Sequence, residues 1–334
     1  MSETRSRNIT KRELPEDIRL ELGDYLDSRE LSRFAMLNQE TNILFKLPLK
    51  ERALRKFIDH VIHGEVDNLR SILNTYPEFL FKKVTIDLYG ETTFVDYSPL
   101  ELACYAHDIE MLQVMSKFLD KNGRMQLAKM IDDTLTEDKS KVGFDFRALE
   151  QAISRQNADE IKDEFDKFKT YSNPKKIKNI KSYNIYNLTN AYSILISNFE
   201  RWNGNEKDFF WRRVVGTCQY SLPAVYAHAF CQGLVYLEGI FIISRYDFRL
   251  MAGQYFYKRN DINKTGLGYE YAINCNMLTA PYWGAKASAY TPFVDNLLAT
   301  NKVISKLRRH PFSQMVALKL ELEKPQLLES IIFL

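Results

Sequence analysis

The residues best suited to chemistry in this chain of 334 amino acids are Cys218, His228 and Cys231, which fall close together in an aromatic segment. His228 and Cys231 are three positions apart, so a helix would place them on one face. Thiolate and imidazole groups are zinc ligands, and a cysteine beside a histidine base can attack an acyl group. The segment lacks a fourth zinc ligand at a usual spacing. We therefore expect no metal, no cofactor and no catalytic residue, and keep a Cys-His hydrolase in the C-terminal half as an alternative.

Charge and glycine patterns point away from two other kinds of partner. The formal net charge is only +3, and the basic runs at 175–181 and 308–310 are short enough to be ordinary solvated surface. Gly266 and Gly268 do not form a dinucleotide-binding fingerprint, because Tyr271 occupies the third glycine position. We expect proteins or small molecules as partners, and no nucleic acid.

The cysteine count and the apolar runs indicate the environment of the chain. Four cysteines are widely spaced in a long sequence, which argues against a disulfide framework. The N-terminus is charged and lacks the apolar region of a secretory signal peptide. No run approaches the roughly 20 apolar residues that a membrane helix needs. We therefore expect a soluble protein with no membrane span and no cleaved signal peptide.

The N-terminal elements from Leu14 to Phe45 are strongly patterned and short. Helical spacing from Pro15 onward places several apolar side chains on one face, namely Ile18, Leu22, Tyr25 and Leu26. Asp27 and Ser28 then interrupt the pattern as capping residues. Two or three helices of this length cannot close a core of their own. Their remaining apolar face must therefore meet something else.

The apolar spacing at 49–171 predicts pairs of helices with breaks at Gly64, Asp108 and Asn157. The second pair begins with Ser98 as a helix cap, a proline at the first helical position and Glu101 three residues after the cap. Between the first two pairs, an alternating segment centred on Gly90 predicts a β-hairpin.

A polar, basic stretch at 172–184 is the best candidate for a linker in the sequence. Beyond it we expect helices to about residue 231, strands between about 235 and 275, and helices again at 292–322. The expected fold class is mainly α, ending in an α+β region with a few strands.

The ordered pattern of the N-terminal stretch resembles the F-box, the three-helix module that docks substrate receptors on the Skp adaptor of cullin-RING ubiquitin ligases. The resemblance rests on Leu14, Pro15, Ile18, Leu22, Leu26, Leu31, Leu37 and Phe45. It implies that an adaptor-binding surface is formed by Leu14, Pro15, Ile18, Leu22, Leu26 and Leu31.

The segment "SPLELACYAHDIEMLQVM" resembles an ankyrin repeat, with matches at Ser98, Pro99, Leu100 and Ala103. The irregular spacing of the breaks marks these repeats as degenerate. The resemblance implies a solenoid-like scaffold that binds protein. A plain set of helix pairs is the alternative.

An F-box followed by ankyrin-like helices is similar to effectors that intracellular bacteria deliver into host cells. The blocks "FFWRRVVGTCQYSLPAVYAHAFC" and "GLGYEYAI" are similar to segments of the same kind of effector, and "ELEKPQLLESIIFL" resembles a type IV secretion signal. The expected domains are an F-box-like module at 1–48, ankyrin-like repeats at 49–171 and a C-terminal domain at 185–334.

The resemblance implies a non-enzymatic receptor in the host cytosol that links a host target protein to the adaptor and the ligase. An interaction scaffold without adaptor binding is the main alternative to this hypothesis. The Cys-His hydrolase is the second.

Overall fold

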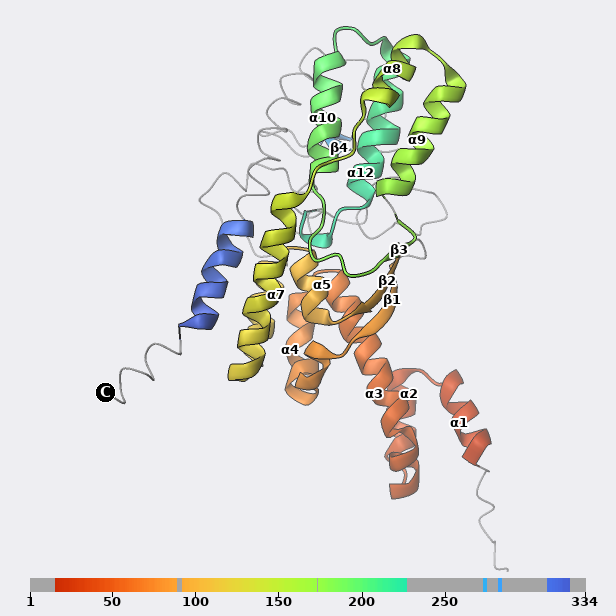
Figure 1. Ribbon diagram of the computed structural model, residues 1–334. Coiled ribbons are helices and arrows are strands. Elements are labelled where there is room, and N and C mark those ends of the chain that lie inside the picture. Colours follow the sequence, from red (N-terminus) through yellow and green to blue (C-terminus); the bar gives the residue numbers. More distant parts are fainter. Residues whose placement is uncertain are drawn as a thin grey trace, which may run out of the picture. The chain divides into compact units, whose positions relative to one another are not determined.

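The computed structural model describes residues 16–88, 92–172, 174–226, 273–274, 282–283 and 311–324 (Figure 1). These parts are mainly helical, with one small three-stranded sheet and one short strand pair. The chain divides into two compact units, Met1–Asp59 and His60–Leu334.

The first unit contains α1 (Glu16–Tyr25), α2 (Ser28–Ala35) and most of α3 (Gln39–Ile62). The expected capping at Asp27 is confirmed, because its side chain accepts hydrogen bonds from the backbone of Arg29 and Glu30. At the start of α3, Asn38 Oδ1 accepts a hydrogen bond from the Thr41 backbone N–H at 2.8 Å. These caps end one helix and begin the next, and so produce three separate helices within residues 16–62.

Helix α3 continues through Pro48, so residue 48, where we expected the first domain to end, lies within a helix. A proline removes one backbone donor and usually interrupts a helix. Here buried side chains occur on both sides of the proline, Phe45 before it and Leu54 and Phe57 after it. Packing of both flanks keeps the helix continuous, and the boundary between the units falls after Asp59.

The second unit begins with a run of helices that contains a hairpin. The elements are α4 (Val66–Thr75), the 3-10 helix η1 (Pro77–Phe81), β1 (Val84–Leu88), β2 (Thr92–Tyr97), α5 (Pro99–Tyr105), α6 (Ile109–Ser116) and α7 (Lys121–Ser140). Gly64 has a φ of 68° and separates α3 from α4 as expected. Ser98 and Glu101 form the expected capping box at the start of α5.

The hairpin is confirmed, since β1 and β2 pair in antiparallel orientation. A third strand, β3 (Lys176–Ile177), pairs in parallel with β2. The prediction of a linker at 172–184 is therefore wrong. The lysines of this segment indicated that it would be exposed to solvent, but Ile177, Ser182 and Tyr183 are buried and pack the segment against the fold.

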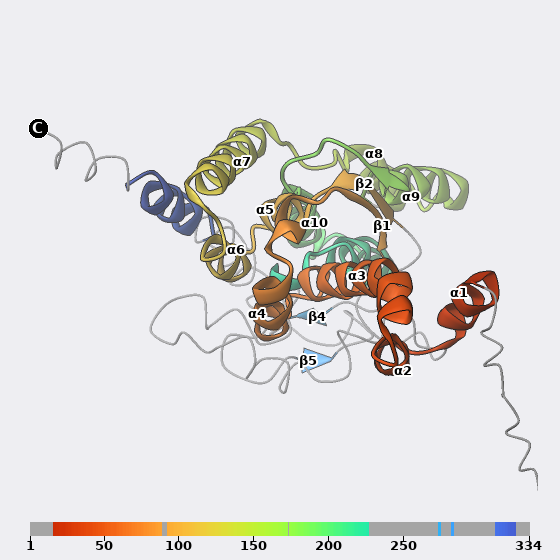
Figure 2. The same cartoon turned by 90° about the horizontal axis from the view of Figure 1, so that it is seen from below.

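The remaining helices enclose a core of aromatic and aliphatic side chains. They are α8 (Arg147–Arg155), α9 (Ala158–Ser172), α10 (Tyr186–Asn198), α11 (Gly204–Phe209), the π-helical η2 (Phe210–Val215) and α12 (Gly216–Tyr220). The core runs from Phe146 on one side of the supposed linker to Tyr226 on the other. Figures 1 and 2 show α8 and α9 side by side, and the break at Asn157 lies between them.

The C-terminal described residues include a strand pair and a helix. β4 (Ile273–Asn274) lies at the end of the region where we expected strands and pairs with β5 (Tyr282–Trp283). Residues 311–323 are helical, and Lys319 forms an ion pair with Asp132 of α7 at 2.6 Å. The other strands and helices expected after residue 226 lie outside the described residues. None of the helices that the structure describes is long and apolar enough to cross a membrane.

Candidate functional site

The first unit exposes many large apolar side chains for its size. Its closed core consists of Leu31, Ala35 and Phe45. The exposed large apolar side chains are those of Ile18, Leu20, Leu22, Tyr25, Met36, Leu37, Ile43 and Leu47. Isolated apolar residues are normal on a surface, whereas a group of this kind is a candidate interaction site.

The orientation of α1 explains part of this exposure. Its inward residues are small or polar: Gly23 packs against the Phe45 ring, and Arg19 forms an ion pair with Glu40 at 2.6 Å. Ile18, Leu22 and Tyr25 follow one another at helical spacing and are 41%, 40% and 80% exposed. The apolar face of α1 is therefore turned away from the core of its own unit.

Arg52 of α3 holds the C-terminal end of α1. Its guanidinium donates hydrogen bonds of 2.6 Å to the carbonyl oxygens of both Gly23 and Leu26. The last carbonyls of a helix lack partners within the helix and carry partial negative charge, so a guanidinium satisfies both needs. This contact fixes α1 without covering its apolar face.

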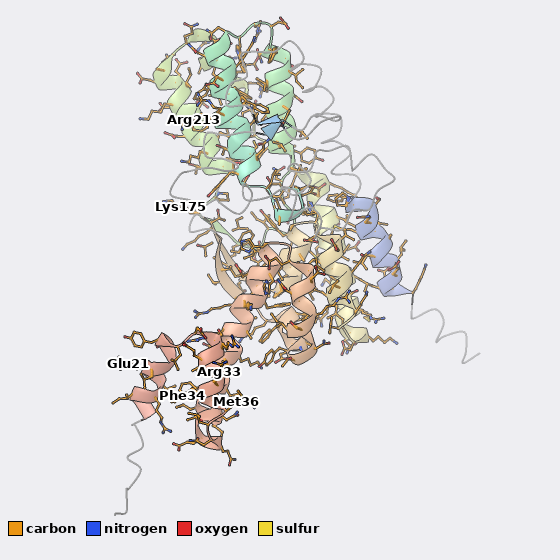
Figure 3. The ribbon with its side chains drawn as sticks, turned by 180° about the vertical axis from the view of Figure 1, so that it is seen from behind. Glu21, Arg33, Phe34, Met36, Lys175 and Arg213 are labelled. Carbon is orange, nitrogen blue, oxygen red and sulfur yellow. The ribbon has the colours of Figure 1, made fainter. Side chains whose placement is uncertain are left out.

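A second exposed group lies on α2 and α3. Met36 at the end of α2 is 70% exposed, while the nearby Phe34 ring packs against Phe45 with ring centroids 5.5 Å apart (Figure 3). Ile43 and Leu47, four positions apart on α3, are 68% and 62% exposed. Both apolar groups therefore coexist with a core that is already closed.

The six residues expected to bind the adaptor occupy different environments. Leu14 and Pro15 lie outside the described residues. Ile18 and Leu22 are exposed, Leu26 is half-buried against the small core, and Leu31 is fully buried. In this structure Leu31 supports the module from inside and offers no surface.

The sequence pattern did not indicate that Met36, Ile43 and Leu47 lie on the surface. The spacing of Ile43 and Leu47 was a signal for a shared helix face. Spacing alone could not show which side of α3 the core would occupy.

Cys218, the one member of the candidate Cys-His group among the described residues, is unsuited to nucleophilic attack. It lies fully buried in α12, and burial raises the pKa of its thiol. A reactive cysteine needs the opposite, a lowered pKa and access to substrate. His228 and Cys231 lie outside the described residues, and no metal-binding group of His, Cys, Asp and Glu occurs among the residues that the structure describes.

A buried polar group in the second unit was missed from the sequence. His107 Nδ1 is 2.6 Å from the Tyr226 hydroxyl, and its Nε2 is 2.8 Å from Ser182 Oγ. All three side chains are almost completely buried. Their positions are far apart in the chain, so no local pattern could have indicated the group. Buried polar atoms that satisfy one another in this way tie distant segments together.

Comparisons with known proteins give one distant relative. No family model matches the chain, and no solved structure matches it. An uncharacterised protein of the intracellular bacterium Coxiella burnetii is 22% identical over 185 residues, which cover 55% of this chain and 49% of that protein. The chain thus spans about half the length of the curated relative that it matches.

Proposed function

We propose that this chain is a substrate receptor that docks on the Skp adaptor of a host cullin-RING ubiquitin ligase. The observation that supports the proposal is the exposed apolar face of α1, formed by Ile18, Leu22 and Tyr25, beside a closed core. Covering an apolar side chain contributes roughly 25 cal/mol for each Å² removed from water, and Ile18 and Leu22 still expose about 40% of their surface. Such residues supply the centre of a contact, and the surrounding interface must offset the cost of association.

The second unit would present the host target. Its helix pairs and hairpin suit a binding scaffold, in keeping with the resemblance to ankyrin repeats. The receptor would need no chemistry of its own, because holding a target beside the ubiquitin-charged enzyme raises its effective concentration. We assign Cys218 no catalytic role, because it is buried and the pKa of its thiol is raised.

The biological setting is part of the proposal. The chain would be a bacterial effector that leaves the bacterium by type IV secretion and acts in the host cytosol. The distant relative from an intracellular bacterium supports this setting in a general way.

The decisive experiment measures binding of the purified full chain to the purified Skp adaptor by calorimetry. We expect one-to-one binding by the parent and at least about tenfold weaker binding by the double variant Ile18→Ala with Leu22→Ala, as for central residues of an interface. Alanine favours helices, so α1 should persist.

Matched controls come from exposed apolar residues of the second unit. Val142→Ala and Met125→Ala change side chains that are 75% and 49% exposed and should leave adaptor binding unchanged. A further variant, Leu14→Ala with Pro15→Ala, tests the start of the F-box-like pattern. Absence of binding by the parent would contradict the proposal and favour a scaffold without adaptor binding. Equal weakening by the controls would show that the contact does not involve α1.

A further inference from the structure

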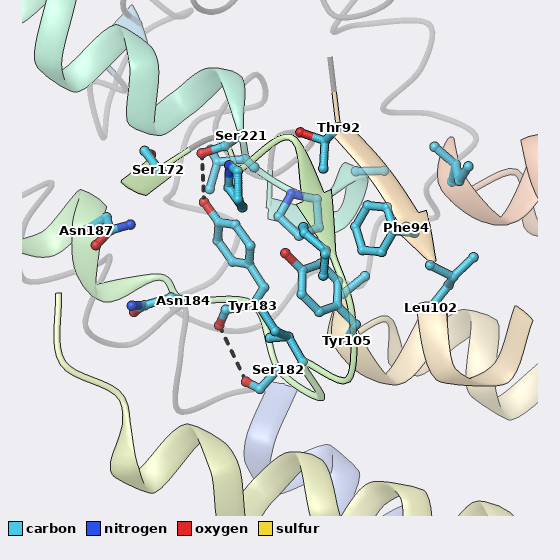
Figure 4. A pocket seen from close by; sticks show the side chains of 18 of the residues that line it. Thr92, Phe94, Leu102, Tyr105, Ser172, Ser182, Tyr183, Asn184, Asn187 and Ser221 are labelled. Atoms are coloured by element: carbon cyan, nitrogen blue, oxygen red, sulfur yellow. Dashed lines mark hydrogen bonds between the residues drawn. The ribbon is translucent and has the colours of Figure 1, made fainter. Parts of the chain in front are cut away.

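The second unit contains a cavity of about 270 Å³ (Figure 4). Its wall is formed by segments that are distant in sequence: β2, α5, the end of α9, the stretch that follows α9, and the turn after α12. Protein interiors are close-packed, and few voids exceed the size of a water molecule. A cavity of this size is therefore a candidate binding site.

Three aromatic rings form a firm part of the wall. The Phe94 and Tyr105 rings meet nearly at right angles with centroids 5.2 Å apart, and Tyr105 and Tyr183 do so at 6.1 Å. The backbone N–H of Tyr183 also donates a hydrogen bond to the Tyr105 carbonyl oxygen at 2.9 Å. Edge-to-face contacts of this kind hold the rings in place, and such rings favour an aromatic guest.

The hydroxyls of Tyr105 and Ser172 lie on the wall and form no hydrogen bond within the described part of the chain. The Tyr105 hydroxyl is directed into the cavity in Figure 4, and no described residue bonds to it. Ser172 Oγ is buried and also without a partner among the described residues. By contrast, the Tyr183 hydroxyl lies 3.3 Å from Ser221 Oγ and is already paired. Buried polar groups are normally satisfied, so Ser172 Oγ calls for a ligand atom. Tyr105 is partly buried, and its hydroxyl faces the cavity, where it can bond to a ligand.

The Tyr105 hydroxyl can donate a hydrogen bond to a ligand. Burial raises its pKa well above the usual value, so the group keeps its proton at neutral pH. A protonated phenol both donates and accepts, and a carbonyl oxygen is an acceptor that its proton can meet.

The charged residues on the wall are already paired. Asp108 caps α6 by accepting a hydrogen bond from the Met111 backbone at 3.0 Å, and Lys141 forms an ion pair with Glu137 at 2.8 Å. A charged ligand would lose its hydration and gain no new counter-ion here. The wall therefore favours a neutral molecule.

We propose that this cavity binds a neutral, planar aromatic molecule of one or two rings whose hydrogen-bond acceptor meets the Tyr105 hydroxyl. The size follows from the volume, which is just below the range of sites for drug-sized ligands. The site would be separate from the docking function of the first unit.

The test uses three small probes with the full chain, monitored by fluorescence and calorimetry. Coumarin is neutral, flat and carries a carbonyl acceptor, naphthalene lacks the acceptor, and coumarin-3-carboxylate adds a negative charge. We expect saturable one-to-one binding of coumarin, weaker binding of naphthalene, and binding of the carboxylate at least about tenfold weaker than that of coumarin.

Two variants locate the site. Tyr105→Phe keeps the ring and removes the hydroxyl, so it should weaken coumarin binding about threefold to tenfold and leave naphthalene binding unchanged. Ala106→Leu places a larger side chain on the cavity wall and should abolish binding of both probes. Unchanged thermal unfolding would show that both variants keep the fold.

Three results would overturn the proposal. They are no saturable coumarin binding at millimolar concentration, tighter binding of the carboxylate than of coumarin, and coumarin binding that neither variant alters.

Discussion

Gly23 of α1 lies so close to the ring of Phe45 that a Cβ atom at position 23 would stand 2.8 Å from Phe45 Cε1. A Gly23→Leu substitution should destabilise the first unit by about 1–3 kcal/mol, because the two helices would have to separate. Amide hydrogen exchange of α1 measures this effect directly. The control is Asp24→Leu, which adds the same side chain at an exposed neighbouring position. Equal effects of the two variants would contradict the close approach of α1 and α3.

Arg52 connects α3 to the end of α1 through two hydrogen bonds to carbonyl oxygens. Arg52→Met keeps much of the side-chain volume and removes both bonds, so α1 should lose about 1.5–3 kcal/mol of protection against opening. Arg52→Lys keeps the charge but not the fork geometry, and should fall between the parent and the methionine variant. If adaptor binding depends on a docked α1, affinity should fall in the same order. Full binding by an Arg52→Met protein with an unprotected α1 would contradict that dependence.

Tyr97 connects β2 to the stretch that follows α9. We expect this contact to make the stability of the fold sensitive to high pH. Its hydroxyl donates to the Ile180 carbonyl oxygen at 2.7 Å and accepts from the Ile180 N–H at 2.8 Å. Burial raises the pKa of this hydroxyl from 10.0 to about 12. The neutral form is thus favoured in the folded state, and this stabilisation is present below pH 10 and lost as the pH rises through 12.

The free energy of unfolding, measured with urea, should therefore fall between pH 10 and 12. Tyr97→Phe starts lower at pH 9 because two hydrogen bonds are lost. Across the alkaline range it should lose about 1–2 kcal/mol less than the parent. Parallel curves for parent and variant would show that Tyr97 does not cause the decline.

The two hydrogen bonds of the buried His107 ring should contribute to the stability of the second unit. His107→Phe keeps an aromatic ring but removes the hydrogen bond that each of the Ser182 and Tyr226 hydroxyls makes to the imidazole, so we expect a loss of about 2–4 kcal/mol in urea unfolding. Ser182→Ala removes one hydrogen bond and should cost less. In the double variant the Ser182→Ala effect should shrink, because its partner is already gone. Additive effects would contradict a direct bond between the two side chains.

Local signals in the sequence predicted local structure well. The caps at Asp27 and Ser98, the positive φ at Gly64 and the hairpin around β1 and β2 depend on residues within a few positions of one another. Such features follow from backbone geometry and short hydrogen bonds, which the order of residue types largely determines.

Contacts between distant residues could not be predicted in the same way. The spacing of Ile18 and Leu22 indicates an apolar face, but it does not show which way that face turns. In the structure Arg19 pairs with Glu40, while Ile18 and Leu22 are exposed. The lysines at 175–181 indicated an exposed linker, although Ile177 among them pairs with β2 in the sheet. Tyr105, Ser172 and Ser221 line the same cavity but come from separate segments of the chain, so no local sequence pattern could indicate it.

Cys104 and Cys218 are both buried in the second unit, and burial raises the pKa of each thiol. A protonated, enclosed thiol reacts with alkylating reagents only while the surrounding helices are open. The rate of alkylation of each thiol, followed by mass spectrometry, therefore reports how often α5 and α12 open. Comparing the two rates would reveal whether these helices open together or one after the other.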